Sequence, residues 1–195
     1  MEQSNQEYKK RELPQKLGYV GWLLLAAGLI LGIIGFFTDH HRAMLNYLMA
    51  YMFVLSIGIG SLLLIAIEYV AGADWSVPIR RVVELLAASL LLLPILVLPL
   101  IFSIHDIFHW AHAEAVAKDE ILKAKSPYLN ETFFIIRVFV VLVLWILFYY
   151  LIIRNSNEQD KTKNQLLTKK NIILSAVFIP VFAITITITA VDWLM

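Results

Sequence analysis

Histidines and aspartates stand where three apolar segments of the chain end. Asp39 follows the first segment, His105, Asp106 and His109 follow the third, and Asp192 follows the fifth. Imidazole titrates near neutral pH, and a partly desolvated carboxylate holds a proton more readily than an exposed one, so both groups can accept protons from a reacting hydroxyl. If the three segment ends meet, these five side chains are candidate catalytic residues of a proton-accepting site.

The histidines of the third segment are spaced so that a continuing helix would put them on one face. His105, His109 and His112 stand at i, i+4 and i+7. That spacing also suits a metal ion, but exposed histidines on a solvated helix are the commoner explanation, and we predict no metal site. A haem held by two facing histidines is disfavoured because none of them lies deep in an apolar segment.

A second polar group stands near the opposite ends of the second and third segments. It contains Glu68, Arg80, Arg81 and Glu84. Arg80 and Glu84 are four residues apart, a spacing that favours a local ion pair on a helix. Two interpretations remain open for this group, an interfacial structural pair or the mouth of a proton path. Arg137, about one turn into the fourth segment, is expected to extend its charge to the membrane surface.

The elements that carry these groups are predicted to be membrane-spanning helices. Hydrophobic residues make up 60% of the chain and charged residues only 16%, against about 25% in soluble domains. A span needs about 20 apolar residues. Five stretches qualify, at 18–37, 45–70, 82–104, 133–153 and 172–191. We therefore expect an all-α integral membrane bundle at 17–195, with a peripheral first helix and a four-helix bundle, after an N-terminal segment at 1–16.

The distribution of Lys and Arg predicts the orientation, since short cationic segments stay on the cytoplasmic side. Eleven Lys and Arg residues lie around the amino terminus and in the second and fourth connections together, against four in the first and third connections together. The amino terminus and the Glu68–Glu84 group are therefore expected inside, and the His and Asp group outside. No basic run interleaved with aromatics is present, so nucleic acid is not expected as a partner.

Four local features qualify this scheme. The long third connection is expected to hold an amphipathic helix at 113–125, ended by Ser126 and Pro127. Alternating Ile and Thr at 184–189 resemble a strand, but an unpaired strand cannot be satisfied in lipid, so a helix is expected. The connection at 154–171 is expected to be a loop. Prolines inside the third and fifth spans predict kinks at Pro94, Pro99 and Pro180.

Four short stretches resemble a known family. They are Trp75-Ser76-Val77 with Arg80-Arg81 and Glu84, His109-Trp110-Ala111-His112, the run 124–130 with 133–137, and Asp192-Trp193-Leu194-Met195. In these stretches the chain resembles the NrfD-like membrane subunits, specifically those of the ActF type in alternative complex III, a quinol:cytochrome c oxidoreductase of the bacterial inner membrane.

The resemblance implies a multi-pass subunit that supports quinol oxidation, and possible proton movement, without a cofactor of its own. The partners it implies are a sister NrfD-like membrane subunit, an iron–sulfur subunit and c-type cytochromes that carry the haem. The cysteine-free composition agrees, because this chain cannot hold a thiolate-bound cluster. It also implies that the chain is an amino-terminal half, continued by a second bundle beyond Met195. The alternative hypothesis is a non-redox scaffold or a transporter-like bundle.

Overall fold

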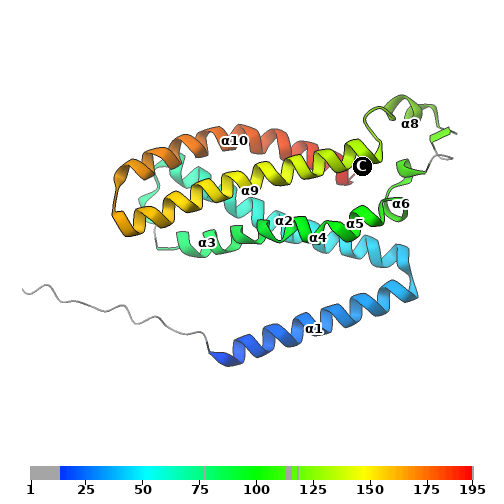
Figure 1. Cartoon of the computed structure of the whole chain (residues 1–195), viewed down its shortest axis with the longest axis horizontal. Coiled ribbons are helices and arrows are strands. Elements are labelled where there is room, and N and C mark those ends of the chain that lie inside the picture. The colour runs from blue at the N-terminus through cyan, green and yellow to red at the C-terminus, as the bar shows by residue number, and fades with distance from the viewer. Residues whose placement is uncertain (1–13, 77, 113–115, 118, 195) are drawn as a thin grey trace, which may run out of the picture. The chain divides into compact units, whose positions relative to one another are not determined.

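The computed structural model is helical throughout the residues that it describes, 14–76, 78–112, 116–117 and 119–194, and no strand occurs among them. Five helices of this described part are long and apolar enough to cross a membrane, which confirms the predicted all-α membrane fold (Figure 1). The chain divides into two compact units, Met1–Ala43 and Met44–Met195. Most of the predicted N-terminal segment at 1–16 lies outside the described residues.

The first unit holds helix α1, Gln15–Thr38, and the start of helix α2, His40–Ala71. Asp39 alone separates the two helices, and its carboxylate accepts a hydrogen bond from the backbone N–H of Arg42 at 3.0 Å. This arrangement is a helix N-cap, which satisfies a donor that α2 leaves free. None of the α1 residues is buried within the chain.

The second unit is a bundle of antiparallel helices (Figure 1). Its fourth and fifth spans, α9 and α10, lie side by side along their length. Its third span is broken into short helical pieces. The elements after α2 that form the spans are α3 (Arg80–Ala87), η2 (Ala88–Leu91), α4 (Leu93–Leu96), α5 (Leu98–Phe102), α6 (Ile104–Ile107), α9 (Glu131–Thr162) and α10 (Gln165–Leu194).

The connection between α9 and α10 is much shorter than predicted. The loop expected at 154–171 is wrong, because α9 continues to Thr162 and only Lys163 and Asn164 separate it from α10. Lys163 adopts a left-handed conformation with φ of 53°, and the Asn164 side chain accepts from Leu166 N–H at 3.0 Å. Polar residues sustain a helix once it leaves the membrane, so loss of hydropathy did not mark the helix end.

Proline affects the third and fifth spans differently. Pro94 and Pro99 each stand in the first turn of a new helical piece, α4 and α5, where a missing N–H removes no helical bond. The third span is therefore interrupted, as its prolines predicted. Pro180 lies inside α10, which continues through it as one helix.

The Ile/Thr alternation near the chain end is helical, as expected, because the threonine hydroxyls bond within α10. Thr185 donates to the Val181 carbonyl at 2.8 Å and Thr189 to the Thr185 carbonyl at 2.9 Å. Thr185 also accepts a hydrogen bond from the indole N–H of Trp145, which is fully buried between α9 and α10. These two threonine hydroxyls and the Trp145 indole thus each have a partner, which apolar surroundings favour.

The third connection is irregular. It contains the helices η3 (His109–Ala111) and α8 (Glu120–Lys125). The backbone is extended at the residue before each of them, Phe108 and Asp119. Asp119 caps α8 by accepting from Ile121 N–H at 2.8 Å. The prediction of one continuous amphipathic helix at 113–125 is therefore wrong at Asp119, which caps a new helix, whereas the second half of that range is helical and ends before Ser126 as predicted. Residues 113–115 and 118 lie outside the described residues.

Candidate functional site

A buried ion pair joins the fourth and fifth spans at the end of the bundle where α9 begins and α10 ends. Arg137 donates to the two carboxylate oxygens of Asp192, from Nε at 2.7 Å and from Nη2 at 2.9 Å. The side chains are 10% and 2% exposed. Planar guanidinium matches a carboxylate in this two-point geometry. We call this end of the second unit the Asp192 end.

Residues from the third connection complete the pair. The Tyr128 hydroxyl donates to Asp192 at 3.1 Å, and Arg137 donates to the Tyr128 carbonyl at 2.9 Å. The guanidinium also lies over the rings of Tyr128 and Phe133. Burial, and then the charge of Asp192, raise the pKa of the Tyr128 hydroxyl. Arg137 does not extend to the membrane surface as predicted, because a buried carboxylate from α10 neutralises it.

A second acid–base pair lies at the same end. The Nε2 atom of His105, on α6, is 2.9 Å from a carboxylate oxygen of Glu131, the first residue of α9. The His112 ring lies 5.9 Å from the His105 ring and 6.4 Å from the His109 ring, measured between centroids. The three histidines thus gather, although the helix that was expected to align them ends at Ile107.

A cavity of about 510 Å³ opens beside the Glu131–His105 pair. Glu131, Asn130 and Leu129 line one wall, and Trp110 and Lys123 contribute to the rest. Trp110 is itself buried and stacks on Phe108 with ring centroids 5.2 Å apart. The cavity therefore combines an aromatic wall with the Glu131 carboxylate, which is paired with the His105 imidazole. Such a pairing can take a proton from a bound hydroxyl and pass it on.

The five residues predicted to form one site take separate roles. Asp39 belongs to the first unit, where it caps α2, and Asp192 is engaged by Arg137. His105 pairs with Glu131 beside the cavity. Asp106 and His109, which are close to His105 in sequence, are exposed. The sequence reasoning missed Glu131 and Tyr128. Glu131 stands in the first turn of α9, a common position for an acidic residue, and only the fold brings it to His105.

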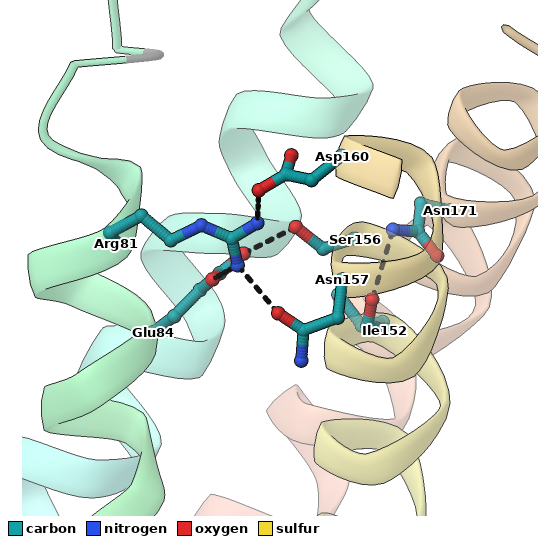
Figure 2. A network of polar contacts seen from close by, with 7 residues as sticks. All are labelled: Arg81, Glu84, Ile152, Ser156, Asn157, Asp160 and Asn171. Carbon is teal, nitrogen blue, oxygen red and sulfur yellow. Dashed lines mark hydrogen bonds and ion pairs between the residues drawn. The ribbon is translucent and has the colours of Figure 1, made fainter. Parts of the chain in front are cut away.

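A network of polar contacts closes the opposite end of the bundle, which we call the Glu84 end (Figure 2). Glu84 on α3 is buried, and it accepts a hydrogen bond from Ser156 of α9 at 2.6 Å. Arg81 pairs with both Glu84 and Asp160, and it donates to the Asn157 carbonyl oxygen at 2.9 Å. The ion pair predicted for Arg80 is thus formed by Arg81, one residue later, because that position faces α9.

Glu68 and Arg80 differ from this network. Glu68 is 3% exposed, and within the described part of the chain neither of its carboxylate oxygens has a hydrogen-bond partner. Arg80 instead lies over the ring of Tyr69, 4.7 Å from its centroid. An unpaired buried carboxylate is costly in apolar surroundings. Glu68 is therefore the residue of the predicted second group that packing does not explain.

The two ends are separated by about one membrane thickness. Arg137 and Ser156 both lie on α9, 19 residues apart, which corresponds to about 28 Å along a helix. The hydrocarbon core of a bilayer is about 30 Å thick. The two polar networks therefore stand near the two boundaries of the apolar region, and neither lies at its centre.

Fold and polar groups together define a multi-pass helical membrane protein with a buried ion pair at the Asp192 end of its bundle and a buried glutamate paired to an exposed arginine at the Glu84 end. No protein-family model and no curated protein sequence matches the chain. Among the described residues, no group of three or more His, Cys, Asp or Glu side chains could hold a metal ion.

Proposed function

We propose that the chain is a cofactor-free membrane subunit of a respiratory quinol:cytochrome c oxidoreductase of the bacterial inner membrane. The observation that carries this proposal is the cavity at the Asp192 end, where Trp110 provides an aromatic wall beside the Glu131–His105 pair. A quinol headgroup is a flat ring with two hydroxyls, so it needs a surface to pack against and a base to take its protons.

In this proposal the residues of the chain act on protons and leave electron transfer to partners. A quinol hydroxyl donates its proton to Glu131, and His105 accepts from that carboxylate and releases the proton to water near His112. Oxidation of one quinol to quinone releases two protons and two electrons. The electrons pass to iron–sulfur or haem c groups of partner subunits, because this chain has no cysteine and no histidine deep in a span.

The proposal keeps Asp192 out of the reaction. Its carboxylate is held in two-point contact by Arg137, so in this scheme the pair is a clamp that positions the third connection against α10. The expected partners are the sister NrfD-like membrane subunit, the iron–sulfur subunit and the c-type cytochromes. The lysine and arginine distribution supports an external Asp192 end, on the same side as such cytochromes.

Turnover of the assembled complex tests the proposal. Glu131→Gln and His105→Gln should each lower quinol:cytochrome c turnover by about 100-fold, the usual size of a lost general base, while assembly is unchanged. Glu120→Gln is the matched control, since Glu120 is an exposed carboxylate on α8 outside the cavity. Full activity of both cavity variants, with loss of activity in Glu84→Gln, would refute a site at the Asp192 end.

Glu68 favours a second candidate function, a transporter-like bundle without redox chemistry. A buried carboxylate with no hydrogen-bond partner in the described chain is a natural place for a transported proton or cation. The two candidate functions predict different co-purifying proteins. Extraction in mild detergent should recover haem-bearing partners with the chain if it belongs to an oxidoreductase, whereas a transporter-like bundle would purify without them.

A further inference from the structure

A groove on α9 near the Glu84 end combines cations with apolar and aromatic surface. Its volume is about 520 Å³. Tyr150 and Ile153 line the part toward the bundle centre, and Arg154 and Lys161 line the part toward the helix end. Both cations are exposed, and within the described residues no ion pair engages either of them. The groove plays no part in the function proposed above.

The contact between Arg81 and Asn157 leaves one more hydrogen-bond donor, the Asn157 amide, available to this groove. The carbonyl oxygen of Asn157 accepts from Arg81, and a guanidinium can only donate, so the amide N–H₂ group of Asn157 is left over. Asn157 also lines the groove, and Figure 2 shows its amide nitrogen outside the drawn contacts. Glu158 is a further lining residue, so two cations and one carboxylate leave a net positive charge of about one unit.

An exposed apolar stripe leads along α9 to the groove. Its residues follow the helical spacing of four and three that keeps side chains on one face. They are Ile136, Val140, Val143, Leu147 and Tyr150, all exposed. Arg154, four residues beyond Tyr150, continues the same face into the groove. The apolar run of the span ends just before it, at Ile153, so Arg154 stands at the boundary of the hydrocarbon region.

We propose that this groove binds the headgroup of an anionic phospholipid, with an acyl chain along the stripe. The phosphodiester carries one negative charge, which matches the net charge of the groove, and Arg154, Asn157 and Lys161 supply donors for its oxygens. Aromatic side chains such as Tyr150 prefer this depth of the membrane. A basic pocket next to a spanning helix is a typical site for anionic lipid on the cytoplasmic side, where the cation distribution puts this end.

Titration of the purified chain in detergent, followed by native mass spectrometry, tests the proposal. Phosphatidylglycerol should bind more tightly than phosphatidylcholine. The double variant Arg154→Gln/Lys161→Gln should weaken phosphatidylglycerol binding by about 25-fold, since each cation near an anionic headgroup is worth about a factor of five. The matched control is Lys169→Gln/Lys170→Gln, which removes the same charge from exposed positions on α10 and should retain the affinity.

Two further arms separate the possible ligands. Inorganic phosphate and glycerol phosphate should compete weakly, because they lack the acyl chain that the stripe holds. Equal binding of both lipids, an equal loss in the two double variants, or competition by inorganic phosphate as strong as by lipid would each overturn the proposal. The first of these outcomes would assign the stripe to a protein neighbour.

Discussion

At the residue scale, the Arg137–Asp192 pair joins the last two spans by a two-point ionic contact. Its side chains are nearly buried, so the pair exchanges hydration for two charge-assisted hydrogen bonds. In such a site an unpaired charge strongly destabilises the folded state, so removal of one partner lowers stability more than removal of both. The pair therefore contributes mainly by forbidding other arrangements of α10 and the third connection.

Double-mutant analysis tests this view of the pair. Arg137→Leu and Asp192→Leu should each lower the free energy of unfolding by about 3–5 kcal/mol, since each leaves a buried charge without its partner. The double variant should be more stable than the sum of the single effects implies. Denaturation of the purified chain in detergent measures all three values. Strictly additive losses would mean that the two side chains do not interact as described.

At the element scale, the close approach of the second and third spans depends on Gly58. A Cβ atom at this position would lie 2.7 Å from the Ser89 hydroxyl and 3.1 Å from two carbons of the Leu90 side chain. Ser89 is held by its hydrogen bond to the Leu86 carbonyl, and Leu90 is fully buried. The irregular η2 segment of the third span can therefore lie against α2 only where α2 has no side chain.

Substitution of two neighbouring glycines tests this contact. Gly58→Ala should destabilise the chain by about 1–3 kcal/mol, the usual cost of overpacking a close interface. Gly60→Ala is the matched control, because nothing lies within 4 Å of its Cβ position, and it should stabilise α2 by up to about 1 kcal/mol. Thermal unfolding in detergent measures both. Similar stability of the two variants would contradict the described packing of η2 on α2.

At the scale of the whole molecule, orientation decides what each polar end can do. The Glu84 end carries the groove cations and the short α9–α10 connection, and the Asp192 end carries the cavity. Cations that flank spans stay in the cytoplasm, so the Glu84 end should face inward. Both proposals depend on this assignment, the quinol site through its external partners and the lipid site through the anionic leaflet.

Reporter fusions test the orientation. A reporter that is active only outside the cytoplasm should be active when fused after His112, in the third connection, and silent when fused after Lys163, between α9 and α10. A cytoplasmic reporter at the same two positions is the control and should give the reverse pattern. External activity after Lys163 together with none after His112 would show that the predicted orientation is reversed.

The sequence by itself determined the spans, because hydropathy over about 20 residues is a local property that lipid enforces. All five spans and the helical state of 184–189 follow from it. Hydropathy also explains why the helix ends were missed. It reports where the membrane stops, whereas α9 continues to Thr162 because backbone hydrogen bonding, capping and the Lys163 turn decide where a helix stops.

Only the tertiary structure decided which polar groups meet. Sequence spacing suggested Arg80 for Glu84, but the helix rotation that packs α3 on α9 gave that role to Arg81. Likewise Arg137 and Asp192 are 55 residues apart in sequence, and Glu131 meets His105 only because α9 begins beside α6. Partners of this kind are set by distance in space and by the high cost of an unpaired charge in apolar surroundings, and no local pattern in the sequence records either.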